Sequence, residues 1–281
     1  MQRIVLVIDE SGEKGFSKRP EAYLGAIGVM SGYIFFEQGI DEVRGIFDSL
    51  LKKFKVNGKL HLTDLHAVQQ EEVRKIIFSF FQKGDVGWVN QAIYSQGLYQ
   101  SIYEPARNGD GKPQKLHVEL FYGLFVKAVA RARLYGDDAT HIRIITDVID
   151  KKTLREFKEK ADHYINVLQG NKITRYFQSY DHENKKPIKT YIDTQVVTKN
   201  PTSFKSLEYS IESEDSSLTF VADVLANSAH YYLKKKQDTD TGIDLNTRLA
   251  IEPHPLSKQL FIPYEEGQRD FFDALYRRTS D

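Results

Sequence analysis

The chain contains no cysteine among its 281 residues, and this absence excludes several kinds of protein. It rules out disulfide frameworks, thiolate zinc sites and catalysis by a cysteine nucleophile. Any bound metal ion would therefore be held by oxygen or imidazole ligands. The sequence has no apolar run near the roughly 20 residues of a membrane span. It also enters its first strand without the basic stretch and apolar core of a signal peptide. We expect a cytoplasmic protein with no membrane contact.

An excess of charge of either sign is also absent. Lys and Arg together number 39, as do Asp and Glu, so the formal net charge is zero. This balance argues against a protein that coats nucleic acid with a broadly basic surface. It leaves room for a local basic groove beside an acidic centre. The 17 Phe and 16 Tyr residues are enough for a large aromatic core, so one large domain is the simplest organisation.

Alternating strand and helix patterns predict a mixed α/β domain that spans residues 1–281. The apolar run after the first strand follows a polar loop, which indicates an antiparallel pair with an open connection. The predicted strands are 3–9, 22–30, 85–94, 141–146 and 205–213, with weaker strand signals within 172–200. The predicted helices are 37–54, 69–83, 115–134, 152–168, 216–235 and a terminal helix near 265–277.

The first strand carries the most informative feature of the sequence. Its apolar run ends at Asp9-Glu10-Ser11-Gly12. Carboxylates beside a buried strand are costly unless something binds them. A second apolar strand ends at Asp147, and Asp223 lies within an apolar helical stretch. If the two strands are neighbours, a helix packed on the sheet could bring all three aspartates to one point.

Converging carboxylates repel one another and raise one another's pKa, whereas a divalent cation turns this repulsion into attraction. Oxygen ligands suit Mg²⁺ and Mn²⁺, and two such ions can catalyse phosphodiester hydrolysis. The alternatives are ordinary. A single Asp after a strand is usually a turn or helix cap, and Asp223 could be buried against a Lys or Arg. The metal hypothesis depends on the three residues meeting.

Three histidines and three basic residues are further candidates. His61 and His66 flank Asp64, and His117 opens the helix at 115. A lone histidine is more often structural, and the spacing of His61 and His66 lacks the one-turn register of a helical zinc pair. The basic residues of the loop after Asp9 are expected to border the site; they are Lys14, Lys18 and Arg19.

The motif Asp9-Glu10-Ser11-Gly12 resembles the opening of the bacterial domain of unknown function 3800 family, in the ribonuclease-H-like superfamily. Three further features are similar to that family over roughly residues 3–235: His61-Leu62-Thr63-Asp64-Leu65, the strand ending at Asp147, and Ala222-Asp223. The resemblance implies a ribonuclease-H-like mixed sheet flanked by helices, with helical and β insertions. It also implies metal-dependent cleavage of RNA or DNA, in mobile-element or phage-related biology.

The resulting prediction assigns roles to five residues. Asp9, Asp147 and Asp223 hold Mg²⁺ or Mn²⁺, and Glu10 is an auxiliary ligand or orients water. His61, the histidine within the resembling motif, positions water or contacts a phosphate near the metal.

The chain departs from the family at Lys59, where members often carry a Glu near the middle motif. Glu10, Asp150 and Asp215 are candidate substitutes, although Asp150 could equally cap the helix that begins near Lys152. This departure motivates an alternative function, a non-catalytic nucleic-acid- or protein-binding module with a degenerate site. A phosphatase or nucleotide hydrolase with the same metal geometry is a third possibility.

Overall fold

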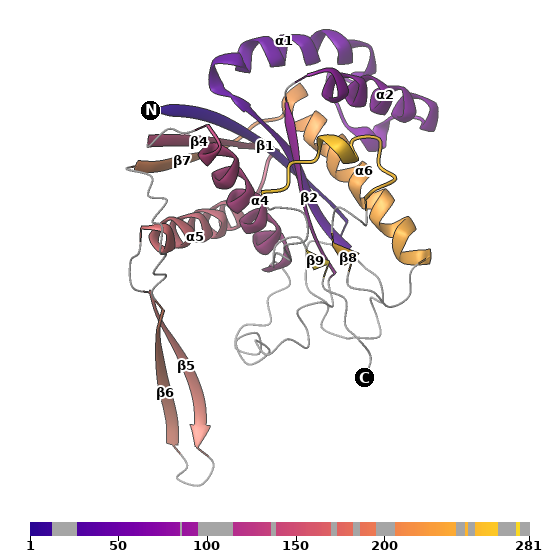
Figure 1. Cartoon of the computed structure of the whole chain (residues 1–281). Coiled ribbons are helices and arrows are strands. Elements are labelled where there is room, and N and C mark those ends of the chain that lie inside the picture. The colour runs from indigo at the N-terminus through magenta and orange to yellow at the C-terminus, as the bar shows by residue number, and fades with distance from the viewer. Residues whose placement is uncertain are drawn as a thin grey trace.

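The central element of the computed structural model is a five-stranded mixed sheet with strand order β3-β2-β1-β4-β7 (Figure 1). β1 is antiparallel to β2, which is antiparallel to β3, whereas β1, β4 and β7 run parallel. The strands are β1 (Gln2–Gly12), β2 (Ile27–Phe36), β3 (Gly87–Tyr94), β4 (Ala139–Thr146) and β7 (Ser206–Ser213). The structure describes residues 1–12, 27–84, 86–94, 115–135, 139–169, 173–181, 186–194, 206–239, 245–246, 251–263 and 274–275. The predicted mixed α/β sheet is confirmed.

Helices cover both faces of this sheet. One face packs against α1 (Ile40–Leu51), α2 (Ala67–Lys83) and α6 (Ser217–Thr239), and the other against α4 (Lys115–Arg133) and α5 (Lys151–Leu168). Alternate residues of β1 contribute to the two cores, because successive side chains of a strand point to opposite faces. Val5 and Val7 face α6, whereas Ile4, Leu6 and Ile8 face α4. Burial on both faces explains why β1 is a continuous apolar run.

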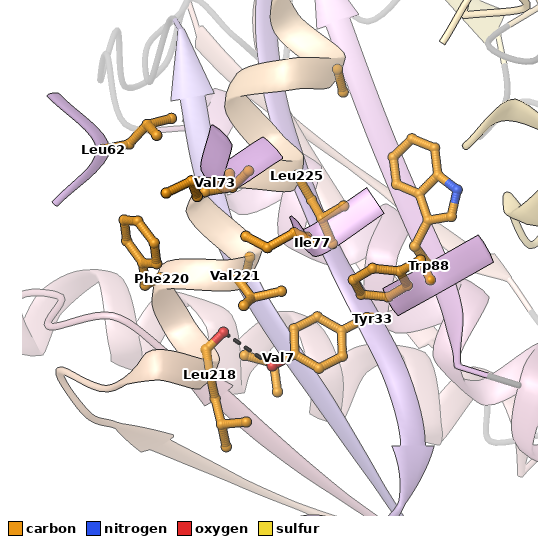
Figure 2. Close-up of a cluster of buried hydrophobic side chains, with 14 of the residues drawn as sticks. Val7, Tyr33, Leu62, Val73, Ile77, Trp88, Leu218, Phe220, Val221 and Leu225 are labelled. Atoms are coloured by element: carbon orange, nitrogen blue, oxygen red, sulfur yellow. Dashed lines mark hydrogen bonds between the residues drawn. The ribbon is translucent and has the colours of Figure 1, made fainter. Parts of the chain in front are cut away.

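On the face of the sheet that α6 covers, buried aromatic side chains also donate hydrogen bonds (Figure 2). Tyr33 of β2 is fully buried, and its hydroxyl donates a hydrogen bond of 3.1 Å to the carbonyl oxygen of Leu218 in the first turn of α6. The indole of Trp88 in β3 donates one of 2.7 Å to the carbonyl oxygen of Leu256. The first bond ties the start of α6 to β2, and the second ties the segment 251–263 to β3.

The two N-terminal strands differ from the sequence prediction. β1 continues to Gly12 because Asp9 to Gly12 pair with Ser31 to Gly28 of β2, so there is no turn directly after Asp9. β2 runs to Phe36, whereas the prediction ended it at residue 30. Ser31-Gly32 resembles a turn in sequence, yet Gly32 lies mid-strand, where an added Cβ would be 2.0 Å from the carbonyl oxygen of Val7. Residues 22–26 of the predicted strand lie outside the described residues.

The remaining predicted elements shift by a few residues, with one exception. The predicted helix 37–54 consists of a central α-helix flanked by two 3₁₀ helices, η2 (Glu37–Gly39) and η3 (Lys52–Phe54). The weak strand signals form an antiparallel pair, β5 (Ile173–Asp181) and β6 (Lys186–Thr194), which extends away from the sheet in Figure 1.

The prediction of a terminal helix near 265–277 is wrong at Ala274–Leu275. This dipeptide is β9 and pairs with β8 (Leu245–Asn246), a partner that local periodicity cannot reveal. The rest of that prediction lies outside the described residues. Two short 3₁₀ helices, η4 (Leu62–Asp64) and η5 (Ser257–Gln259), complete the described elements. Among the described residues, no helix is both long and apolar enough to cross a membrane.

Candidate functional site

The register of β1 and β4 places Asp9 beside Asp147. The two strands are parallel neighbours, and Ile8 aligns with Thr146, so the next residue of each chain segment stands at the same level. Val7 and Ile145 both belong to the core on the α6 face. Two residues further on, strand alternation directs Asp9 toward that face as well, and Asp147, directly after the end of β4, is close enough for its charge to act on Asp9. The condition on which the metal hypothesis depends, that these two strands are neighbours, is therefore met.

Helix α6 brings the third aspartate to the same place. Val221, Ala222 and Leu225 bury this part of the helix against β1 and β2, and Asp223 is partly buried beside them. A pocket of about 210 Å³ opens here. Its polar lining comprises Asp9, Glu10, His61, Thr63, Asp147, Asp215, Thr219 and Asp223. The structure therefore gathers all five residues assigned to the site from sequence; their roles stay predictions.

The motif around His61 forms one wall of this pocket. Leu60, Leu62 and Leu65 are buried in the core on the α6 face. His61 and Thr63 stand between the anchoring leucines and line the pocket. The leucines thus fix the segment, while the intervening polar residues are left to face the carboxylates. A hydrogen bond from the backbone N–H of Leu62 to Asp223 ties this wall to α6.

The electrostatics of Asp9 reflect crowding by like charges. Burial raises the pKa of Asp9 well above its ordinary value, and the charges of Glu10, Asp223 and Asp147 raise it further. A hydrogen bond of 2.8 Å from the Glu10 N–H to Asp9 Oδ1 acts in the opposite direction. Asp9 is therefore harder to ionise than an exposed carboxyl, because its surroundings disfavour negative charge.

Asp223 responds to the same crowding. Burial is the largest effect and raises the pKa of Asp223 to about 6, and the charges of Asp147 and Glu10 contribute to the rise. The Leu62 N–H and the nearby His61 lower it in part. The charged neighbours that shift this pKa are thus acidic groups and a histidine. Within the part of the chain that the structure describes, they do not include a Lys or Arg, which was the rival explanation for a buried aspartate.

Glu10 has a histidine neighbour on its other side. His117 Nε2 of α4 lies 3.4 Å from Glu10 Oε2, and the imidazole packs edge-on against Phe157 with ring centroids 5.0 Å apart. Sequence reasoning named His117 as one candidate among three without assigning it to Glu10. Because the contact joins α4 to β1, residues far apart in the chain, no local pattern indicates it.

Five other candidates have structural explanations or lie beyond the described part. Asp150 caps α5, where its Oδ1 accepts hydrogen bonds of 2.9 and 3.0 Å from the N–H groups of Lys152 and Thr153. The capping interpretation of Asp150 is therefore confirmed. His66 precedes α2, and its N–H donates to Gln69 Oε1 at 3.1 Å. It does not line the acidic pocket. The loop residues Lys14, Lys18 and Arg19 lie outside the described residues.

Like Glu10, the candidate substitute Asp215 reaches the pocket. It lies between β7 and α6, and its Oδ2 is 3.7 Å from Lys59 Nζ. Lys59 therefore sits beside the acidic pocket as an ion-pair partner and does not line it. The position that departs from the family resemblance thus has a partner among the nearby acidic residues.

The donor set fits a hard divalent cation in its chemistry, since it consists of carboxylate oxygens with one imidazole. No three Asp, Glu or His side chains in the described part of the chain already have the spacing of a metal site. Carboxylates that repel one another tend to stay apart. The arrangement is a convergent acidic pocket and not a preformed metal cage.

In comparisons with known proteins, the chain matches no family model, no curated protein and no solved structure. The resemblance to the domain of unknown function 3800 family therefore depends on the motif residues themselves. The ribonuclease-H-like assignment stays a prediction, whereas the mixed sheet with helices on both faces is a property of this structure.

Proposed function

We propose that the protein is a metal-dependent nuclease that hydrolyses phosphodiester bonds of RNA or DNA. Asp9, Asp147 and Asp223 would bind Mg²⁺ or Mn²⁺, with Glu10 as an auxiliary group. The observation that supports this proposal is the convergence of these four carboxylates on one pocket, where burial and, to a smaller extent, their mutual repulsion raise the pKa of Asp9 and Asp223. Such an arrangement is costly without a cation and typical of sites that bind one.

The chain's own residues would hold the site in place. Asp9 and Asp147 belong to adjacent parallel strands, whose ladder of hydrogen bonds limits their movement. Asp223 is fixed by the packing of α6 and by the Leu62 N–H. Bound divalent ions would supply an activated water and a charge that stabilises the leaving oxygen.

Two neighbouring side chains complete the proposed roles. Glu10 lies beside Asp9 and against His117, and it would orient a water molecule within the pocket. His61 lines the pocket from the opposite wall and would contact a phosphate oxygen.

The direct test is cleavage of labelled RNA and DNA in the presence of Mn²⁺ by wild type and Asp9→Asn. We expect the substitution to lower the cleavage rate by about a hundredfold or more, because it removes a proposed metal ligand. Asp150→Asn is the matched control. It makes the same chemical change at a helix cap outside the pocket, where Asn is also a good cap. Equal rates for wild type and Asp9→Asn would remove the proposal.

A second candidate function is a nucleic-acid- or protein-binding module without catalysis. Two observations favour it: no preformed metal group is found among the described residues, and Asp215 is engaged by Lys59. Calorimetric titration with Mn²⁺ separates the two functions. Micromolar binding that disappears in Asp223→Asn would exclude the non-catalytic module, whereas the absence of binding to wild type would support it.

A further inference from the structure

A second pocket, of about 270 Å³, lies directly beside the acidic one. The two pockets share Leu60 and Asp215 in their linings, so they are neighbours along one surface. The second pocket lies between α1, the segment 55–60 and the N-terminus of α6. Its character is different, because most of its charged lining is basic.

Three cations line this second pocket: Arg44, Lys55 and Lys59. Arg44 lies 3.0 Å from Glu214, and Lys59 lies 3.7 Å from Asp215. Lys55 forms no ion pair with any residue that the structure describes. Asp48 and Asp215 are the acidic residues of the lining. With Glu214, the three cations have three carboxylates around them, and Lys55 is the cation left available to an anionic ligand.

A tight turn holds the lysine segment in position. Val56 and Lys59 exchange backbone hydrogen bonds of 2.8 and 3.0 Å around Asn57-Gly58. Asn57 and Gly58 have φ values of 51° and 82°, as an Asn-Gly hairpin turn requires. Lys55 and Lys59 therefore flank a short, well-defined turn and not an unstructured loop.

The remaining wall is the start of α6, a helix of 23 residues. The first N–H groups of a helix lack intrahelical acceptors and favour negative charge. Ser217, at the first position of this helix, is only 3% exposed, and its hydroxyl has no hydrogen-bond partner among the described residues. A buried hydroxyl without a partner is costly. Ser217 belongs to the lining, but its hydroxyl oxygen is almost inaccessible, so a ligand oxygen would complete its bonding only after the side chain turns toward the pocket.

We propose that this second pocket binds a phosphate group of a nucleic-acid strand, one that neighbours the phosphodiester at the acidic pocket. Lys55, the Ser217 hydroxyl and the N-terminus of α6 would contact the phosphate oxygens. This inference deepens the proposed function and depends on it for the identity of the strand. It implies a substrate with at least two phosphates, which favours a polynucleotide over a small phosphoester.

The test measures the binding of a fluorescein-labelled single-stranded oligonucleotide by fluorescence anisotropy. EDTA is present so that no cleavage occurs. We expect Lys55→Gln to weaken binding about tenfold and to reduce the slope of log Kd against log salt by about 0.7, the value for one phosphate contact. Ser217→Ala should also weaken binding with an unchanged melting temperature, because the hydroxyl has no partner within the protein. Inorganic phosphate should compete with the oligonucleotide.

Lys53→Gln is the matched control. Lys53 lies two residues from Lys55, makes an ion pair with Glu72 and does not line the pocket. Its substitution should change the affinity by less than about twofold. The inference is overturned if the Lys53 and Lys55 variants lose affinity equally, if Lys55→Gln binds like wild type, or if wild type binds no oligonucleotide.

Cleavage assays separate failure of this inference from failure of the nuclease proposal. Mn²⁺-dependent cleavage by Lys55→Gln with a wild-type KM would reject the phosphate pocket and leave the nuclease intact. Oligonucleotide binding that is lost in Lys55→Gln, in a wild type that cleaves nothing, would retain the pocket and reject the nuclease.

Discussion

Replacing Asp223 with Asn should stabilise the metal-free protein at neutral and alkaline pH. The reasoning begins with the carboxyl of Asp223, which is partly buried and close to the charges of Asp147 and Glu10. Both effects disfavour its ionised form in the folded state. Asn has nearly the same shape, keeps an oxygen that can accept the Leu62 N–H, and carries no charge.

The pKa of Asp223 gives the magnitude and the sign. It rises from an ordinary 3.8 to about 6 on folding, a difference that corresponds to about 3 kcal/mol. Because the folded pKa is raised, the folded state binds the proton more tightly than the unfolded chain does. Wild-type stability therefore falls as the pH rises between these two values, and the full cost is present above the folded pKa. Asp223→Asn should remove up to this amount.

Urea unfolding in EDTA at a series of pH values measures the effect. The gain in unfolding free energy of Asp223→Asn over wild type should be close to zero near pH 4 and reach about 3 kcal/mol near pH 8. Asp150→Asn should show no such gain, because Asp150 is an exposed helix cap whose pKa is lowered by its hydrogen bonds to Thr153 and Lys152. Saturating Mn²⁺ should stabilise wild type more than Asp223→Asn, by about 2.7 kcal/mol at a hundred times Kd if the variant does not bind.

Two results would refute this reasoning. A gain that does not vary with pH would mean that the carboxylate charge of Asp223 is not the source of the cost. A loss of stability at pH 8 would mean that the charged form makes favourable contacts, and the convergence of repelling carboxylates would no longer support a cation site.

Three further predictions concern the framework of the pocket. Leu62→Ala should destabilise the protein by about 2–5 kcal/mol in urea unfolding, because Leu62 is 2% exposed in the core, and it should also lower Mn²⁺-dependent cleavage by loosening the wall that holds Asp223. Tyr33→Phe should cost about 0.5–1.5 kcal/mol in the same assay, since it removes the hydrogen bond from the Tyr33 hydroxyl to the buried Leu218 carbonyl, which keeps its helical partner in α6. His254 is buried against Ser228, and burial lowers its pKa from 6.5 to about 4. It stays neutral in the folded state while the unfolded chain takes up a proton, so it should cost about 3 kcal/mol of stability as the pH falls through that range. His254→Gln should therefore lose less unfolding free energy than wild type between pH 7 and pH 5.

The sequence predicts those parts of the fold that depend on local pattern. β1 alternates between two cores, and its continuous apolar character follows from burial on both faces. α2 and α5 agree with their predicted spans to within two residues, because their apolar residues recur at helical spacing. The ends of β1 and β2 could not be predicted. Asp9 to Gly12 continue the strand through pairing with β2, and Ser31-Gly32 is extended because Val7 lies close against it.

The same distinction applies to the candidate site. Asp9, Asp147 and Asp223 could be predicted because each stands out against an apolar background in its own segment. The partners of these residues could not. The contact between His117 and Glu10 and the bond from Leu62 to Asp223 join segments more than 100 residues apart in the sequence. Only the packing of α4 and α6 on the sheet determines them.

The fold determines how the charges of the chain are distributed, which the net charge does not reveal. A total of zero argues against a basic coating surface, but the sum over a chain does not constrain how charges are distributed. In the folded chain, the charged residues that line one pocket are mainly carboxylates, and those that line the neighbouring pocket are mainly cations. Asp215 belongs to both linings. A nucleic-acid strand carries regularly spaced anions, and the proposed function adds a divalent cation at the bond that is cut. Acidic groups to hold that cation and basic groups to hold the adjacent phosphate are the two surfaces such a ligand needs, and they need not alter the total.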